Sequence, residues 1–324
     1  MARQVRIHQV GGPEALQVEE VEVGLPGHGE VRIQQCAAGV NYVDVYHRTG
    51  LYPLPGLPAV LGVEGAGFVE AVGPGVADLS IGERVAWAGL PVGGYAEARL
   101  LPAERLISLP ALVSERVAAA AMLRGITAHM LLRHVRPVTS GDVVLVHAAA
   151  GGLGLMLTQW ARRLGATVIG TVGSPEKAEL AKRHGLHHAI LYRQVDFVKA
   201  VLDLTDGHGA DVAYDGIGGD VLTRTLDCVR RFGMVVSVGQ AAGSLPAIDI
   251  SELGPRRSLA LARPSVFSYA SDPGTYRIAA SELFREIEAG LHVEIGAEYA
   301  LAEAADAHRA LESGGTTGSV LLNF

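Results

Sequence analysis

The architecture of this chain follows from Val143-Val144-Leu145-Val146-His147-Ala148-Ala149-Ala150-Gly151-Gly152-Leu153-Gly154. The first four residues are apolar and mostly β-branched, which is typical of a fully buried strand. A turn of alanines and glycines follows, and then a helical pattern over 155–164 with Trp160, Ala161 and Leu164 on one face. A strand, a glycine turn and a helix in this order present free backbone N–H groups to a diphosphate. We therefore expect a dinucleotide-binding site here.

The glycine pattern is incomplete, because Ala149 stands where the first glycine of G-x-G-x-x-G would be. Gly151 and Gly154 keep the other two positions, and the pattern lies between a strand and a helix, as a phosphate-binding turn requires. The alternative is a tight turn whose glycines serve only packing. The segments that follow the turn favour the dinucleotide site.

Those segments alternate between strand-like and helix-like patterns. We expect strands over 167–172, 188–191, 212–215 and 233–239, and helices over 176–184, 196–204 and 221–229. This rhythm predicts parallel βαβ units with helices on both faces of one sheet. The predicted fold class is α/β, with a doubly wound parallel sheet.

The flanking regions have a different pattern. Short candidate strands over 5–10, 30–38, 66–72, 84–88 and 95–100 are separated by Gly/Pro turns, which predicts a compact barrel-like β domain. A helical pattern over 126–133 leads to the buried strand. The tail offers helices over 276–289 and 299–311 and a strand over 320–324, too little to fold alone. We expect the tail to return to the first domain, giving a β-rich domain over 1–122 plus 265–324 and an inserted nucleotide-binding domain over 123–264.

Composition excludes several classes of protein. The 324 residues suffice for two domains, and 27 basic against 34 acidic residues give a net charge of −7, which argues against a nucleic-acid or anionic membrane surface. We find no signal-peptide pattern, and no apolar run reaches the roughly 18 residues of a membrane span. With only Cys36 and Cys228, a disulfide framework and a cysteine-built zinc site are excluded. We expect a cytoplasmic protein.

The end of the second expected strand selects the cofactor. An NAD site places Asp or Glu about 20 residues beyond the glycine turn, but 171–174 contains no carboxylate. Small residues there leave room for a 2′-phosphate, Ser174 offers a hydroxyl and Lys177 a positive charge. Tyr192 and Arg193, after the following strand, can close the same pocket. We predict NADPH; the alternative for Lys177 is an exposed lysine at a helix start, beside Glu176.

Several motifs together indicate a family: 37–46 (AAGVNYVDVY), 50–53 (GLYP), 61–67 (LGVEGAG), 82–85 (GERV), 93–97 (GGYAE), 124–128 (RGITA), 147–154 and 214–215. Through them the sequence resembles the quinone oxidoreductase (zeta-crystallin-like) branch of the medium-chain dehydrogenase/reductase superfamily, over nearly the whole chain. The resemblance implies a Rossmann domain that binds NADPH and is inserted into a β-rich, GroES-like catalytic domain.

The same resemblance argues against a metal site. Zinc alcohol dehydrogenases of the superfamily carry cysteine where this chain has Asn41 and histidine where it has Val63, and their four-cysteine structural loop has no counterpart. Without such ligands the Lewis acid that makes alcohol oxidation feasible is missing. We therefore expect no metal and no alcohol dehydrogenase, and we expect His147 and His187-His188 in core or surface roles.

The resemblance also implies the residues of the site. In the family the nicotinamide lies in the cleft between the domains, where Asn41 and Thr127 would hold its ribose or amide. Tyr46 and Tyr52 would line the acceptor pocket with a flat apolar wall and a phenolic donor; alternatively, each is a structural aromatic residue. These four form the predicted catalytic set.

Further cofactor contacts are implied at the diphosphate, the adenosine ribose phosphate and the nicotinamide half: Ala150, Gly151, Gly152, Leu153, Gly173, Ser174, Lys177, Tyr192, Ile217, Val238, Gly239, Gln240, Arg263, Ser265 and Ser319. Two of these have alternatives. Gly318-Ser319 departs from the basic residue common there in relatives, and Arg263 is equally well explained as a salt-bridge residue at the domain junction.

Three functions compete. The first is an NADPH:quinone oxidoreductase, and the second an NADPH-dependent reductase of activated C=C bonds (enals or enones) with Tyr52 as proton donor. The third is a non-catalytic NADPH-binding or RNA-binding protein, which the acidic balance and scattered arginines disfavour. The apolar 258–262 segment predicts a last sheet strand that is unsuited to an exposed edge. In the family the equivalent strand pairs with its twin across a two-fold axis, so the resemblance implies a homodimer. The physiological acceptor, and one- versus two-electron transfer, depend on loops such as 266–269 whose geometry no pattern supplies.

Overall fold

The computed structural model describes all 324 residues and divides into two compact units. The first comprises Met1–Ile126 and Val266–Phe324, and the second comprises Thr127–Ser265. The first boundary falls inside helix α2 (Glu115–His129). The sequence predicts boundaries at 122/123 and 264/265, within a few residues of these; the assignment of catalysis to one unit and of NADPH to the other stays a prediction. None of the helices combines the length and the apolar character that a membrane span requires.

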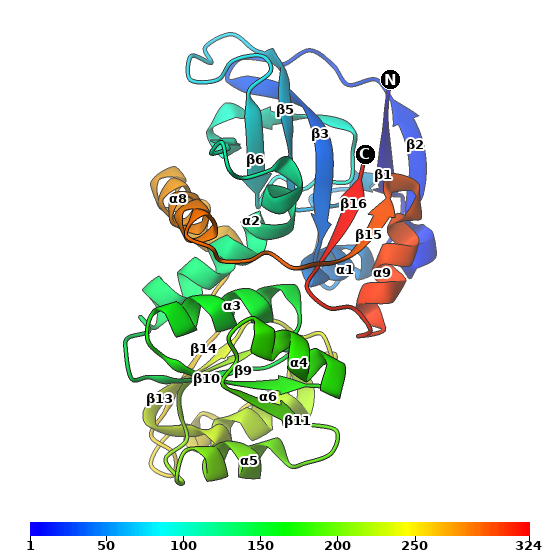
Figure 1. Ribbon diagram of the computed structural model, residues 1–324. Coiled ribbons are helices and arrows are strands. Elements are labelled where there is room, and N and C mark those ends of the chain that lie inside the picture. The colour runs from blue at the N-terminus through cyan, green and yellow to red at the C-terminus, as the bar shows by residue number, and fades with distance from the viewer. The chain divides into compact units, whose positions relative to one another are not determined.

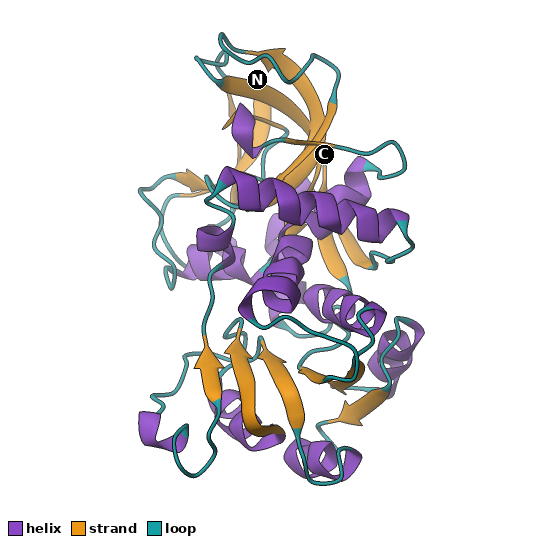
Figure 2. Ribbon diagram, turned by 90° about the vertical axis from the view of Figure 1, so that its left-hand side faces the viewer, coloured by secondary structure: helices purple, strands orange, loops and turns teal.

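The second unit contains a six-stranded sheet in the order β11-β10-β9-β12-β13-β14, with every neighbouring pair parallel (Figure 1). Its strands are β9 (Val143–Val146), β10 (Thr167–Val172), β11 (His188–Leu191), β12 (Ala210–Asp215), β13 (Val229–Ser237) and β14 (Ala260–Ala262). Figure 2 shows neighbouring strands of this sheet pointing the same way. The strand order reverses between β9 and β12, and doubly wound sheets bind dinucleotides at the carboxyl ends of the strands at such a point.

Helices cover both faces of this sheet. They are α3 (Gly152–Arg163), α4 (Pro175–Arg183), α5 (Phe197–Leu204) and α6 (Gly219–Thr225), with a π-helical segment (Met130–Val135) and 3-10 turns at Leu226–Cys228 and Ile250–Glu252. Leu145 and Ile169 of the sheet pack with Phe197 and Val201 of α5 and with Leu222 of α6. Side chains alternate along a strand, so the residues next to Leu145 and Ile169 in the sequence face the opposite side of the sheet. Helix α3 lies on that side (Figure 1).

The first unit is built on two β-sheets. Its strands are β1 (Ala2–Ile7), β2 (Gln17–Val21), β3 (Glu30–Val40), β4 (Ala59–Val60), β5 (Glu64–Val72), β6 (Arg84–Ala88), β7 (Ala98–Pro102), β8 (Ile107–Ser108), β15 (Ile295–Ala300) and β16 (Ser319–Asn323). One sheet has the order β2-β1-β4; the other has the order β15-β16-β3-β5-β6-β8, with β7 also paired to β3. Strand β16 runs antiparallel to β3, with Val320 opposite Val40, so the tail joins the N-terminal part as expected.

Helices of the first unit are α1 (Tyr42–Thr49), the greater part of α2, α7 (Val266–Tyr269), α8 (Pro273–Glu288) and α9 (Ala304–Glu312). Three 3-10 turns accompany them, at Pro13–Ala15, Ala103–Arg105 and Leu301–Glu303. Helix α9 packs on the sheet through Ala304 and Ala307, which share a core with Val320 and Leu322 of β16.

Several expected elements were wrong in type or position. The strand expected over 5–10 lies at Ala2–Ile7, and the helix expected over 126–133 begins already at Glu115 as α2. The helix expected over 299–311 begins only at Ala304, because Ile295–Ala300 alternates in exposure as strand β15. The helix expected over 221–229 ends at Thr225, and a 3-10 turn leads into β13 at Val229. The strand expected over 95–100 starts three residues later, at Ala98.

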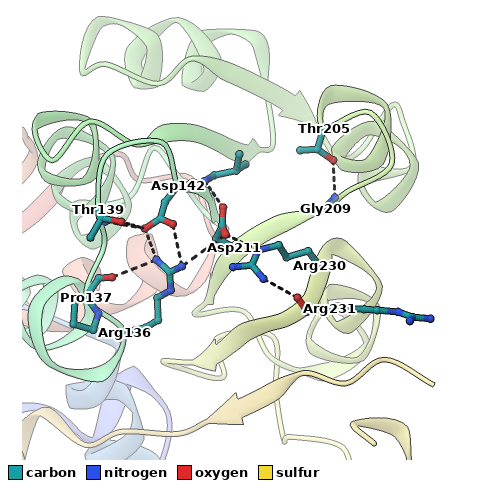
Figure 3. Close-up of polar contacts among 10 residues, drawn as sticks. Arg136, Pro137, Thr139, Asp142, Thr205, Gly209, Asp211, Arg230 and Arg231 are labelled. Carbon is teal, nitrogen blue, oxygen red and sulfur yellow. Dashed lines mark hydrogen bonds and ion pairs between the residues drawn. The ribbon is translucent and has the colours of Figure 1, made fainter. Parts of the chain in front are cut away.

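A cluster of ion pairs fixes the amino ends of three strands of the second unit (Figure 3). The Asp211 carboxylate of β12 accepts hydrogen bonds from Val143 N of β9, at 2.7 Å, and from Arg230 Nε of β13, at 2.6 Å. Arg136 bridges Asp142 and Asp211, and its hydrogen bond to Asp142 raises the pKa of the guanidinium. The cluster lies at the edge of the sheet opposite the strands' carboxyl ends, so we assign it to stability.

Candidate active site

The predicted diphosphate turn joins β9 to α3. Gly151 is the N-cap of α3 and no side chain caps the helix, so the N–H groups of its first turn are available to an anion. Ala148 has a left-handed backbone (φ +51°), and a Cβ on Gly154 would lie 2.3 Å from Ala148 O. Packing alone therefore requires glycine at position 154. Packing does not explain why the start of α3 lacks a capping side chain, but binding of a diphosphate there would.

His147, directly before the turn, is buried and neutral. Its Nε2 and Nδ1 lie 2.9 Å from Thr225 Oγ1 and Thr171 Oγ1 respectively. Thr225 gives its hydroxyl proton to Val221 O, so Nε2 donates to Thr225 and Nδ1 accepts from Thr171. Burial lowers the pKa of His147 to about 4. Both ring nitrogens are used within the core, as expected, and the side chain links three elements behind the turn.

Positive and phenolic side chains gather at the end of β10. A Cβ on Gly173 would lie 3.5 Å from both Arg193 Nε and Tyr192 Oη, and the Arg193 guanidinium lies 5.9 Å from the Tyr192 ring centroid. The pKa of Lys177 is lowered, first by burial and then by the charge of Arg193. Two cations near each other beside a strand end without a carboxylate favour binding of an anion.

Ser174, an expected contact of the 2′-phosphate, also begins helix α4. Its Oγ accepts a hydrogen bond from Lys177 N at 3.4 Å as the N-cap of α4. Its interaction with the exposed Glu176 carboxylate is the first cause of a lowered Glu176 pKa, and it uses the one hydroxyl proton. The Ser174 side chain therefore serves the start of the helix, and its contact with a phosphate stays a prediction, as do those of Lys177, Tyr192 and Arg193.

The expected contacts at the nicotinamide half lie at the carboxyl ends of β12 and β13. The Asp215 carboxylate accepts from Ile217 N at 2.7 Å and from Gly218 N at 3.2 Å, which fixes the turn that carries Ile217. Asp215 O accepts from Val238 N at 2.7 Å and from Gly239 N at 3.3 Å. The structure thus brings Ile217, Val238 and Gly239 together.

Arg263 follows β14 and reaches back to the same edge. Its guanidinium donates to Ser237 Oγ at 3.0 Å and to Gln240 Oε1 at 3.4 Å. Both partners lie in the second unit, as do the expected nicotinamide contacts Thr127 and Ser265. Ser319 is different, because its buried hydroxyl donates to Ala120 O at 2.8 Å in the first unit. Nothing in its surroundings supports the expected cofactor contact.

The remaining expected residues gather around α1 in the first unit. Asn41 is the N-cap of α1; its Nδ2 donates to Glu64 Oε1 at 2.7 Å and its backbone N to Asp44 Oδ2 at 2.8 Å. Tyr46 lies on α1, and its ring centroid is 5.1 Å from that of Tyr52. Tyr52 N donates to Tyr46 O at 3.0 Å, which fixes the loop beyond the helix.

Two more aromatic side chains adjoin this pair. His47 Nδ1 donates to Tyr52 O at 3.1 Å, and its ring lies 6.4 Å from that of Phe267 in a stacked arrangement. Burial lowers the pKa of His47. Phe267 belongs to the 266–269 segment that we expected to shape the acceptor pocket. The four rings thus form one aromatic cluster at the end of α1, in which Tyr46 and His47 are buried and Tyr52 and Phe267 are partly exposed.

Comparisons with known proteins identify the family of this chain. The family described as "Alcohol dehydrogenase GroES-like domain" matches residues 27–111, and the one described as "Zinc-binding dehydrogenase" matches 152–283. A quinone oxidoreductase of Pseudomonas aeruginosa is 45% identical over 323 residues, which cover 99% of either chain. The chain belongs to the quinone oxidoreductase branch of the medium-chain dehydrogenase/reductase superfamily.

Other members of the superfamily are similarly close. A 2-haloacrylate reductase of Burkholderia sp. is 45% identical over 325 residues, covering 98% of this chain and 97% of the reductase. The crystal structure of Escherichia coli quinone oxidoreductase complexed with NADPH is 39% identical, with a TM-score of 0.96 over 99% of this chain and 100% of that one. The predicted fold, a Rossmann sheet with a β-rich GroES-like domain, is confirmed.

One matched family is named for zinc, but the residues of this chain do not fit that ion. Asn41 turns an N–H group toward Glu64, and Val63 is buried and apolar. The Glu64 carboxylate already accepts hydrogen bonds from Asn41, Leu123 and Arg124. No thiolate or imidazole complements it as zinc would require, so the proposed reaction has no step through zinc.

Sequence reasoning gave no role to Glu64 and Asp44. Both lie inside motifs that indicated the family, and both are fully buried. A carboxylate within an otherwise apolar segment is the signal that could have found them, because such a charge is retained only with hydrogen-bond partners.

Proposed function

We propose that this protein is an NADPH-dependent quinone oxidoreductase that reduces a quinone without zinc. The observation that carries the proposal is identity of about 45% over the full length to a quinone oxidoreductase, in a chain whose residues suit NADPH and not a metal. The overall reaction joins quinone, NADPH and one proton to give hydroquinone and NADP⁺. A quinone needs little acid assistance, because the reduced ring becomes aromatic.

The second unit binds the cofactor in this proposal. The uncapped start of α3, with Gly151, Gly152 and Leu153, binds the diphosphate. Lys177, Tyr192 and Arg193 bind the 2′-phosphate, which makes the site selective for NADPH. The turn at Ile217 and the segment Val238–Gln240, with Arg263, border the nicotinamide half.

Residues of both units serve the reaction. Asn41 and Thr127 hold the nicotinamide ribose or amide by hydrogen bonds, and Tyr46 and Tyr52 line the acceptor pocket. Bound NADPH supplies a hydride to the acceptor. Aromatic side chains exclude water from a planar substrate, and the phenolic hydroxyl of Tyr52 offers a hydrogen-bond donor to the acceptor. The meeting of acceptor and nicotinamide between the domains stays a prediction.

The first experiment measures NADPH and NADH oxidation with 1,4-benzoquinone. We expect turnover with a KM for NADPH at least about 10-fold below that for NADH, since two charge-assisted hydrogen bonds to the 2′-phosphate are each worth roughly 1.5 kcal/mol or more. Equal KM values would contradict the cofactor assignment, and absence of quinone turnover would contradict the function.

Reduction of activated C=C bonds is the second candidate, favoured by the 45% identity to the 2-haloacrylate reductase. Such a reaction needs a proton at the α-carbon, and Tyr52 is the proposed donor. Parallel assays with 1,4-benzoquinone, a 2-alkenal and 2-chloroacrylate separate the two. If quinone turnover is absent and Tyr52→Phe abolishes reduction of the C=C bond, the second function replaces the first.

A nucleic-acid partner has little support. Among the arginines that could form a basic surface, Arg230 pairs with Asp211 at 2.6 Å and Arg257 with Asp227 at 2.8 Å. Paired guanidinium groups leave less positive charge for phosphates.

We propose a cytoplasmic enzyme that acts on small molecules and forms a homodimer through the β14 edge.

A further inference from the structure

Glu64 is a buried carboxylate that the proposed reaction does not use. It lies at the start of β5 and is fully inaccessible to solvent. Oε1 accepts from Asn41 Nδ2 at 2.7 Å and from Arg124 at 2.8 Å, and Oε2 accepts from Leu123 N at 2.7 Å. Three donors from α1's N-cap and from α2 thus converge on one side chain.

The surrounding structure is arranged to hold this charge. Arg124 also donates to Val40 O at 2.8 Å and to Ala120 O at 3.2 Å, so β3 and α2 fix the guanidinium. A Cβ on Gly39 of β3 would lie 2.1 Å from Glu64 Oε1, and the glycine leaves the room that the carboxylate needs. Buried ion pairs often contribute little net stability compared with apolar residues. Net stability therefore does not explain why Glu64 is buried here.

That role follows from the partner that Glu64 orients. The two ends of an asparagine amide are nearly equal in size, and hydrogen bonds decide which end faces which way. A carboxylate only accepts, so the NH₂ end of Asn41 must face Glu64 and the oxygen must face away. The backbone of Asn41 is fixed separately by Asp44, and the Asn41 side chain makes no cap hydrogen bond to α1.

We propose that Glu64 is a positioning residue that holds the Asn41 amide with its oxygen as the acceptor for a donor on the nicotinamide half of NADPH. The donor is a ribose hydroxyl or the carboxamide N–H. This inference rests on the proposed function, in which Asn41 contacts that half of the cofactor. Glu64→Gln replaces one acceptor oxygen by an NH₂ group. Turned toward Leu123 N, this group opposes another donor; turned toward Asn41, it lets the asparagine amide rotate, so that the Asn41 oxygen is no longer presented reliably.

Equilibrium binding to the whole protein tests the proposal. The dissociation constants of NADPH and of adenosine 2′,5′-bisphosphate, which lacks the nicotinamide half, are measured by titration for four proteins: wild type, Glu64→Gln, Asn41→Ala and the double variant. We expect Glu64→Gln to weaken NADPH about 3- to 10-fold, and Asn41→Ala to weaken it about 10-fold. The double variant should bind like Asn41→Ala, and the bisphosphate should bind equally to all four.

Other outcomes have defined meanings. If Glu64→Gln weakens NADPH equally with and without Asn41, Glu64 does not act through Asn41 and the proposal is overturned. The proposal is also overturned if Glu64→Gln does not change NADPH binding, or if Asn41→Ala does not change it. In both cases the proposed binding of NADPH by the second unit would still stand. Failure of the wild type to bind NADPH would overturn the proposed function itself.

A second pair of variants keeps the test available if Glu64→Gln does not fold. Glu64→Gln with Arg124→Met removes both charges, leaving no unpaired guanidinium, and the comparison is repeated with and without Asn41→Ala. Weakened NADPH binding only where Asn41 is present supports the proposal. Equal weakening in both backgrounds, or none, rejects it.

Discussion

Single residues at the end of β10 decide which dinucleotide the chain prefers. Arg193 and Lys177 are the cations there, and no carboxylate stands at the strand end. Because binding of a dianionic phosphate would relieve the repulsion between them, we expect each to contribute to affinity for NADPH but not for NADH.

We predict that Arg193→Ala raises the KM for NADPH about 10-fold and leaves the KM for NADH unchanged, as one charge-assisted hydrogen bond is lost. Steady-state kinetics with both cofactors measures the effect. Arg183→Ala is the matched control, since Arg183 is an exposed arginine at the end of α4. An equal rise for both cofactors would show that Arg193 acts on folding and not on the phosphate.

His147 links stability to pH. Its pKa is about 4 in the folded protein, because burial disfavours the charged form, and 6.5 in the reference state. As the pH falls below 6.5 the unfolded chain takes up a proton that the folded chain does not. Stability is therefore complete above pH 6.5 and falls between 6.5 and 4, by up to ~3 kcal/mol.

Substitution of His147 should remove this dependence. In His147→Asn, urea unfolding between pH 4 and 7 should show a smaller loss of stability on acidification than in the wild type, even if the variant is less stable at pH 7. His28→Asn, at an exposed position, is the control and should keep the wild-type slope. An unchanged slope in His147→Asn would contradict the assignment of His147 as buried and neutral.

At the scale of elements, a chain of buried polar side chains joins α9 to α1. Arg48 of α1 binds Glu312 of α9 with two hydrogen bonds of 2.8 Å and donates to His308 Nδ1 at 3.0 Å. His308 Nε2 then donates to Tyr95 Oη at 3.0 Å, and Tyr95 donates to Asp44 at 3.1 Å. Burial raises the pKa of Asp44 to about 7 and lowers that of His308 to about 3. The tail thereby supports the helix that carries Asn41 and Tyr46.

Arg48→Ala should lower the free energy of unfolding by about 3 kcal/mol, because it breaks a largely buried pair and leaves His308 without its donor. Arg309→Ala is the matched control on α9: its pair with Asp306 is exposed and should be worth less than about 1 kcal/mol. Urea denaturation of both variants measures the difference. Equal losses would mean that the buried chain adds nothing beyond a surface ion pair.

Local pattern explains which elements could be predicted. Thr167–Val172, His188–Leu191 and Arg84–Ala88 are apolar runs between turn residues, and the structure has strands with these bounds. Strand β15 (IGAEYA) contains residues common in helices, and its conformation depends on pairing with β16, which lies some 20 residues further along the chain. Propensity could not supply that long-range contact.

The candidate site also has a part that the sequence predicts and a part that it does not. The glycine turn and the missing acid after β10 are local features of the sequence, and from them we predicted a dinucleotide site and NADPH. The hydrogen bonds from Asn41 and Arg124 to Glu64 join residues 23 and 60 positions apart. No periodicity encodes such contacts, because they depend on how β3, β5 and α2 pack.

At the scale of the whole molecule, β14 is the last strand of its sheet, and we predict that a second copy of the chain pairs with its outer edge. Strand β14 pairs only with β13 in its sheet, and an exposed apolar edge strand invites pairing with another chain. Phe232 lies on β13, and its backbone N donates to Ser258 O at 2.6 Å. Its side chain is 84% exposed and its backbone is left-handed (φ +61°), which is strained for a bulky residue.

A homodimer that covers Phe232 explains why an exposed, strained aromatic residue stands beside this edge. Phe232→Gly removes the side chain and accepts the left-handed backbone, so it should halve the mass in light scattering at micromolar concentration without destabilising the subunit. Leu112→Ser, at a residue 82% exposed in the first unit, should leave the mass unchanged. A wild-type protein that is already monomeric would refute the dimer. If the Phe232→Gly protein stays dimeric, Phe232 is not part of the dimer contact, and the edge strand β14 is the remaining candidate.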